Sequence, residues 1–186
     1  MTTLYGPAEI MIGMNESVSR IRLFDGPLDL RWHHCASTSD FIANLFALPF
    51  RASRDDYREV RHNIGYLVNE LVENAVKFRE PGEIMIEAAM DVDSFKIKVS
   101  NVVSVERAAS FQTLLSEITV GEPSDLLIQR IEANAVDPET SGSGLGLLTL
   151  MSDYGARLAW IFSPVEGGGR VHVETFATIP VDQPQQ

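Results

Sequence analysis

The segment that decides the fold is Glu70-Leu71-Val72-Glu73-Asn74-Ala75-Val76-Lys77, near the end of a helical pattern over 54–78. Apolar residues recur there at the i, i+3, i+4, i+7 spacing of a helix with one buried face. Glu70 and Asn74 lie one turn apart on such a helix, and Lys77 continues their row. The pattern predicts a helix that buries leucine and valine and presents a carboxylate, a carboxamide and an ammonium together.

This polar row has two interpretations. Glu70 could act as a general base. The side-chain oxygen of Asn74 could ligate Mg²⁺, which otherwise keeps water and substrate phosphates, and Lys77 could neutralise phosphate charge. Alternatively, the row is an ordinary solvated face that carries an i, i+4 pair between Glu73 and Lys77.

A second informative segment is Ser141-Gly142-Ser143-Gly144-Leu145-Gly146-Leu147, which opens a helical pattern over 145–154. Free backbone N–H groups at a helix N-terminus favour phosphate, so Gly142, Gly144 and Gly146 are candidate phosphate contacts. Glycine-rich loops without phosphate are also common, and one match alone is weak evidence. Residues 119–141, which precede the loop, are expected to form a flexible cover.

Other patterns predict a sheet. Apolar and polar residues alternate over 18–24, and 28–32 follow a turn as a returning strand, which gives a hairpin. A helix is expected over 38–48, with Ser39 or Thr38 as its cap.

Further along, 83–89 and 94–100 predict a second hairpin, 105–140 are helical or loop-like, and 157–162 and 170–178 are the last two strands. This order describes an α+β fold: a mixed, mostly antiparallel sheet covered on one face by helices. We expect a leader over 1–17 that could add a strand, one domain over 18–180, and a disordered tail over 181–186.

Composition restricts the function. The 186 residues carry 15 basic against 26 acidic side chains, a net charge of −11. Binding to nucleic acid or an anionic membrane is therefore not expected, because phosphate affinity is largely electrostatic. The single cysteine, Cys35, allows no intramolecular disulfide. Neither a signal peptide nor a long apolar span is evident, so the expected location is the cytoplasm.

The two segments, in this order, resemble the GHKL superfamily of ATPases and kinases. The stretch 70–78 resembles its N box, 141–147 its second glycine box, and 167–176, which includes Thr175, its closing hairpin. The resemblance implies a Bergerat-type two-layer α/β sandwich that binds ATP with Mg²⁺. By this resemblance, Glu70 is the catalytic base and Asn74 is the Mg²⁺ ligand and a nucleotide contact. The other implied nucleotide contacts are Lys77, Asn101, Gly142, Gly144, Leu145, Gly146 and Thr175.

The chain departs from the superfamily at its Asp-x-Gly-x-Gly box, whose aspartate reads the adenine amino group. The matching segment is Val99-Ser100-Asn101-Val102-Val103-Ser104. The side-chain oxygen of Asn101 can still accept one hydrogen bond from an amino group. The glycines are replaced by β-branched valines, which narrow the backbone options.

Within the superfamily, the chain most resembles stand-alone anti-sigma-factor serine kinases of partner-switching systems. The resemblance implies an ATP-dependent serine/threonine protein kinase or ATPase, with ATP, ADP and a regulatory protein as partners and a homodimer as an option. One alternative is a non-catalytic regulatory module of the same fold with a degenerate adenine pocket. Another is a pocket that accepts a different nucleotide or an aromatic cofactor.

Overall fold

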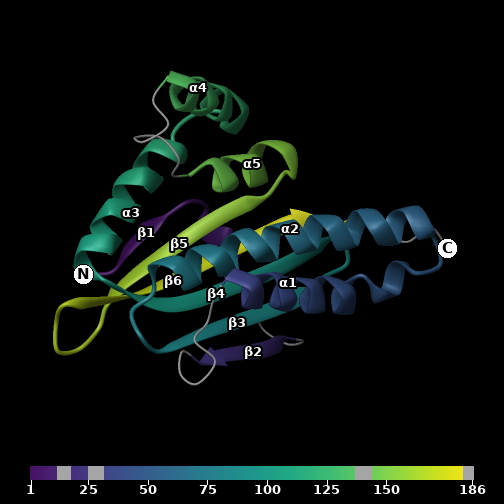
Figure 1. Cartoon of the computed structure of the whole chain (residues 1–186), viewed down its shortest axis with the longest axis horizontal. Coiled ribbons are helices and arrows are strands. Elements are labelled where there is room, and N and C mark those ends of the chain that lie inside the picture. Colours follow the sequence, from purple (N-terminus) through teal and green to yellow (C-terminus); the bar gives the residue numbers. More distant parts are fainter. Residues whose placement is uncertain (12–17, 25–31, 137–143, 182–186) are drawn as a thin grey trace.

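The computed structural model describes residues 1–11, 18–24, 32–136 and 144–181 (Figure 1). These residues form a six-stranded sheet in the order β1-β5-β6-β4-β3-β2, and every neighbouring pair is antiparallel. The strands are β1 (Thr3–Tyr5), β2 (Ser19–Phe24), β3 (Glu83–Met90), β4 (Ser94–Ser104), β5 (Arg157–Pro164) and β6 (Arg170–Pro180). The helices are α1 (Trp32–Phe46), α2 (Arg54–Phe78), α3 (Val105–Ile118), α4 (Pro123–Val136) and α5 (Leu145–Asp153), with short 3-10 turns η1 (Ala8–Met11) and η2 (Leu48–Phe50).

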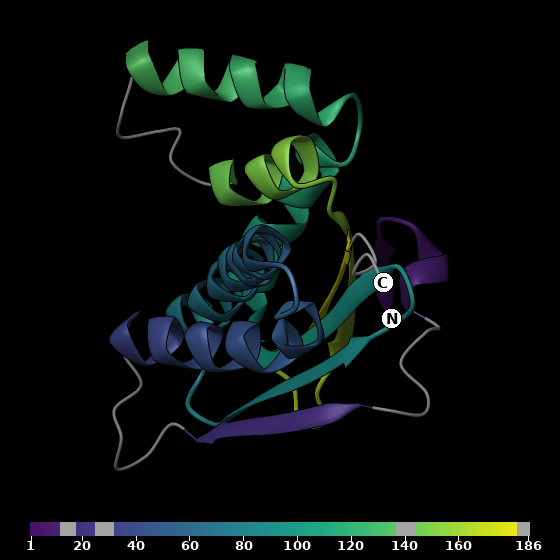
Figure 2. The ribbon, with the colours of Figure 1, turned by 90° about the vertical axis from the view of Figure 1, so that its right-hand side faces the viewer.

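The α helices lie to one side of the sheet, and α4 is outermost, beyond α5 (Figure 2). The core forms between α2 and the helix-facing side chains of the sheet, among them Ile84, Ile86, Phe95 and Ile97, each at most 1% exposed. The predicted α+β sandwich with helices on one face is confirmed. Among the described residues, none of the helices is both long and apolar enough to span a bilayer.

Helix α2 has the boundaries that its sequence predicts. Ser53 is the N-cap and accepts a hydrogen bond from the backbone N–H of Asp56 at 3.3 Å. Such a cap satisfies one of the free donors in the first turn. The helix ends at Phe78, and Arg79 is already extended, just ahead of Pro81 and Gly82.

The region before α2 differs from the prediction. α1 begins at Trp32 rather than near residue 38, so Thr38 and Ser39 lie inside the helix, and their hydroxyls donate to the carbonyls of His34 and Ala36. The predicted returning strand 28–32 is wrong at Trp32, which is helical, and 28–31 lie outside the described residues. Five residues of apolar and polar alternation do not separate a strand from the first turn of a helix.

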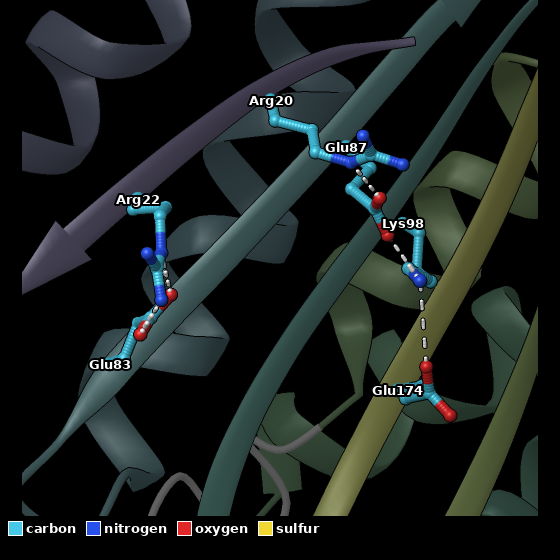
Figure 3. Close-up of polar contacts among 6 residues, drawn as sticks. All are labelled: Arg20, Arg22, Glu83, Glu87, Lys98 and Glu174. Atoms are coloured by element: carbon cyan, nitrogen blue, oxygen red, sulfur yellow. Dashed lines mark hydrogen bonds and ion pairs between the residues drawn. The ribbon is translucent and has the colours of Figure 1, made fainter.

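Strand β2 pairs with β3, a partner distant in sequence. Opposite charges match this register on the open face of the sheet, where Arg20 pairs with Glu87 at 2.6 Å and Glu87 also contacts Lys98 (Figure 3). The Nζ of Lys98 in turn lies 3.6 Å from Oε1 of Glu174 on β6. Cross-strand charge pairs contribute about 0.2–1 kcal/mol each, enough to favour this register over its neighbours.

The start of the chain adds to the other edge of the sheet. β1 pairs with β5, and η1 follows close to β5 and β6. Gly6, between them, has a φ of +79°, and a Cβ there would overlap the carbonyl oxygen of Leu158 and lie 3.0 Å from the Cα of Ala159. Part of the predicted leader therefore belongs to the sheet. The division into domains stays a prediction, and 182–186 lie outside the described residues.

We predict that Gly6→Ala releases β1 from β5, because alanine disfavours the positive φ and its methyl meets the β5 backbone. Faster hydrogen exchange of the β5 amides in the variant is the measurement. Gly168→Ala is the matched control, since Gly168 has a φ of +73° and nothing within 4 Å of its Cβ position. Equal exchange in the two variants would show that the close approach does not hold β1 in place.

Candidate functional site

A cavity of about 810 Å³ lies between α2, α3, the first turn of α5 and the helix-facing side of the sheet. Polar and charged side chains line it from both α2 and α3, and its floor comes from β4, β5 and β6. The lining residues of α2 include Glu70, Glu73, Asn74, Lys77 and Phe78, and those of the floor are Asn101, Val103, Trp160, Val173 and Thr175. α3 contributes Glu106, Arg107, Ser110, Phe111 and Leu114, and the α5 end contributes Gly144, Gly146 and Leu147.

The structure thus brings most of the candidate residues to one cavity. The candidates that line it are Glu70, Asn74, Lys77, Asn101, Gly144, Gly146 and Thr175. Leu145, the first residue of α5, is not among the described residues that line it. Gly142 lies outside the described residues. The roles of all these residues stay predictions.

The row on α2 does not show the surface ion pair of the alternative interpretation. Glu73 accepts a hydrogen bond from Asn69 Nδ2 at 2.9 Å. The Nζ of Lys77 lies 5.1 Å from the ring centroid of Phe78. Both residues of the expected pair therefore have other contacts, and both line the cavity.

Glu70 and Gly146 join the two segments that the sequence singles out. A Cβ on Gly146 would overlap Oε2 of Glu70 and lie 2.7 Å from its Cδ. Glycine is thus required here by the close approach of a carboxylate to the first turn of α5. The sequence predicted a phosphate contact for Gly146, whereas in the structure the Glu70 side chain lies against it.

Gly144 starts α5. It is the N-cap residue with a φ of +94°, a left-handed conformation that glycine adopts without steric cost. A Cβ there would lie 3.0 Å from Cδ1 of Leu114 on α3. The N-terminus of α5 therefore packs closely against α3 at Leu114.

The other end of α5 is held by aromatic contacts to α2. The ring of Tyr154 stacks on Tyr66 with centroids 4.8 Å apart and an interplanar angle of 14°. His62 Nε2 lies 3.2 Å from the Tyr154 hydroxyl. These contacts, one and two turns before Glu70 on α2, fix α5 relative to the polar row.

The electrostatics of Glu70 suit proton transfer. Burial raises the pKa of its carboxyl group above the usual glutamate value, and the nearby charge of Glu73 raises it further. A carboxylate with a raised pKa is a better proton acceptor near neutral pH.

The segment around Asn101 is the largest correction within the site. β4 was expected to end at residue 100, but it continues to Ser104, and Asn101 pairs in register with Val173 of β6. The β-branched valines favour the extended strand where glycines would favour a turn. Ser104 then caps α3 directly by accepting from the backbone N–H of Arg107 at 3.3 Å.

Asn101 itself is buried, with 6% of its surface exposed. Its Nδ2 donates to the backbone carbonyl of Ala75 on α2 at 3.4 Å. This bond uses one of the two N–H groups of the side-chain amide, whose acceptor is Oδ1.

The α3 wall was not predicted from the sequence. Arg107 Nη1 donates to the carbonyls of Phe78 and Arg79 at 3.1 and 3.3 Å, and so joins α3 to the C-terminal end of α2. α3 has an ordinary amphipathic pattern, and no local signal distinguishes its cavity-lining residues. Trp160 was expected to be core, which its 0% exposure confirms, but it also lines the cavity.

The donor set fits Mg²⁺ only if phosphate and water complete the coordination. Among the described residues, no group of three or more His, Cys, Asp or Glu side chains could hold a metal ion. Asn74 and the carboxylates beside it are hard oxygen ligands of the kind Mg²⁺ accepts one or two at a time. A Mg²⁺ ion would thus be held mainly by a bound nucleotide.

Comparisons with known proteins define the fold and no more. No protein-family model matches the sequence, and a search of curated proteins found no match. Among solved structures, the fold is similar to that of a chain from the crystal structure of the SiaB–SiaC complex from Pseudomonas aeruginosa. The TM-score is 0.59 at 12% identity, over 87% of this chain and 89% of that chain.

We predict that Glu70→Gln raises the melting temperature at pH 7.5 by about 2 °C or more. Folding raises the pKa of this carboxyl group, so its ionised form is less favourable in the folded than in the unfolded state. The ionised group therefore lowers the stability of the folded state at pH values above the raised pKa. The gain should vanish near pH 4, where the carboxyl is largely protonated in both states.

Thermal unfolding followed by circular dichroism at both pH values is the measurement, with Glu59→Gln, at an exposed position of α2, as the control. If Glu70→Gln instead lowers the melting temperature at pH 7.5, the N-terminus of α5 stabilises the carboxylate by more than burial destabilises it.

Proposed function

We propose that the cavity binds ATP with Mg²⁺, and that the chain is a regulatory protein that transfers the terminal phosphoryl group to a serine or threonine of a partner protein. The observation that supports this most is the meeting of two segments on one cavity. The polar row of α2 and the glycine-rich start of α5 are far apart in sequence, and Glu70 contacts Gly146 directly.

The size and lining of the cavity suit a nucleotide. Its volume of about 810 Å³ falls within the range of small-molecule sites, roughly 300–1,000 Å³. Glu70, Asn74 and Lys77 supply charge and polarity along α2, while Phe111 and Val173 supply apolar surface on other walls. A nucleotide has the same division, with charged phosphates at one end and a flat base at the other.

Each polar residue then has a chemical task. Asn74 Oδ1 would ligate the Mg²⁺ ion, and Lys77 would neutralise phosphate charge. Glu70 would take the proton of the incoming hydroxyl as its oxygen bonds to the terminal phosphorus and the bond to the leaving ADP breaks. Positioning and charge neutralisation supply most of the catalysis in phosphoryl transfer.

A protein partner is supported by two observations. The structural neighbour comes from a complex of two proteins, SiaB and SiaC. The net charge of −11 favours a partner with a basic docking surface.

The second candidate is a regulatory module that binds its partner without phosphoryl transfer. The Asn101 segment favours it, because this segment is a paired strand and the Asn101 amino group already has a backbone partner. Retention of Glu70 and Asn74 on the cavity wall favours the kinase, since docking alone requires neither.

Calorimetric titration with ATP, ADP and GTP, with and without Mg²⁺, tests the proposal. We expect ATP to bind in the micromolar range with Mg²⁺ present, and Asn74→Ala to lose the effect of Mg²⁺. Absence of binding for every nucleotide would contradict the proposal and favour the docking module.

Glu70→Ala separates binding from chemistry. It should keep Mg²⁺-dependent ATP binding and lose phosphorylation of the partner, because the proton acceptor is gone while the metal and phosphate contacts remain. Transfer of labelled phosphate at the wild-type rate would show that Glu70 is not the base.

A further inference from the structure

Arg107 and Lys77 are basic side chains that line the cavity and form no ion pair within the described ranges of the chain. Several other described basic side chains do have acidic partners; these are Arg20, Arg22, Arg61, Lys96, Lys98, Arg130 and Arg157. The chain has a net charge of −11, so carboxylates are not scarce. The cavity therefore holds two positive charges that no ion pair neutralises.

The guanidinium of Arg107 is fixed by one of its nitrogens. Nη1 donates to the backbone carbonyls of Phe78 and Arg79 at 3.1 and 3.3 Å, at the C-terminal end of α2. Nε and Nη2 have no hydrogen-bond acceptor in the described part of the chain. The Arg107 side chain is exposed, so a ligand in the cavity can reach it. A guanidinium edge with two N–H donors can bind phosphate through two parallel hydrogen bonds.

The acidic side chains closest in sequence to the two cations on the cavity wall have other contacts. Glu106 interacts with its own backbone N–H and with the Ser104 hydroxyl, and both contacts lower the pKa of its carboxyl group. Glu73 accepts a hydrogen bond from Asn69. These carboxylates therefore leave the two cations available for an anionic ligand.

The two cations lie at one end of the polar row of α2. Glu70, Asn74 and Lys77 follow one another along the helix, and a rise of ~1.5 Å per residue places Lys77 about 10 Å from Glu70 along its axis. The carbonyls that hold Arg107 come directly after Lys77. The Glu70 end, by contrast, borders Gly146 of α5. The cations are thus at the end of the row opposite the candidate base.

We infer that Arg107 is a nucleotide-binding residue, which together with Lys77 binds the phosphate nearest the ribose. This inference rests on the proposed function, in which Glu70 acts beside the terminal phosphate and the other phosphates extend along α2. The ligand class of this subsite is a nucleoside 5′-phosphate with any number of further phosphates. Transfer of the terminal phosphoryl group leaves the contact intact, so the product ADP keeps it.

The test compares adenosine, AMP, ADP and ATP in competition with a fluorescent ATP analogue, with Mg²⁺ present. Wild-type protein should bind AMP at least about tenfold more tightly than adenosine, because adenosine lacks the phosphate. Arg107→Gln should weaken the binding of AMP, ADP and ATP by a similar factor, about tenfold or more, since all three share this phosphate. Adenosine should bind the variant and the wild type equally.

Two further variants are controls. Arg58→Gln removes the same charge at an exposed position of α2 that is not among the described residues lining the cavity, and should bind all four ligands as the wild type does. Arg107→Lys keeps a positive charge without the planar fork, and should weaken AMP by less than Arg107→Gln while leaving adenosine unchanged. The lysine variant supplies the comparison if Arg107→Gln does not fold.

A purely structural role for Arg107 gives a different result. If the side chain only joins α3 to α2, its loss should weaken adenosine as much as AMP. That result, or wild-type protein that binds AMP no more tightly than adenosine, would overturn this inference and leave nucleotide binding in place. Failure of the wild type to bind any of the four ligands would overturn the proposed function and this inference with it.

Discussion

The burial of one face of α2 against the sheet is the interaction on which the rest of the structure depends. Ile64, Leu67, Val68 and Val72 on that face are 0% exposed. Each such side chain contributes about 1.5–3 kcal/mol through removal from water. Because this face is fixed, the neighbouring face that carries Glu70 and Asn74 borders the cavity, and a rotation of the helix would force these polar side chains into the core. The packing of the domain and the geometry of its site therefore have one cause.

A second constraint follows from the first. With α2 fixed, the Glu70 carboxylate occupies the space beside the first turn of α5, and only glycine fits at position 146. The first turn of α5, which could bind phosphate, therefore lies close to the polar row of α2, which could bind a metal ion. Burial of the carboxylate raises its pKa, so the ionised group lowers the stability of the folded state.

The sequence predicts those parts of the fold where periodicity is long or turns are clear. α2 matches its predicted range, and the four strands after it begin at their predicted residues, although β4 continues past residue 100 to Ser104. The N-terminal region was predicted less well, because the segment before α1 is short and ambiguous. The pairing of β2 with β3 depends on contacts such as Arg20 with Glu87, which no local pattern reveals. The candidate site divides in the same way: its α2 and α5 residues carry local motifs, whereas the α3 wall becomes evident only once the chain is folded.

The most direct test of the account is a structure determined with Mg²⁺ and a non-hydrolysable ATP analogue. We expect the base to lie on the floor beside Asn101, with the terminal phosphates between Asn74 and the first turn of α5. An analogue bound outside this cavity, or one whose phosphates lie away from Asn74, would contradict it.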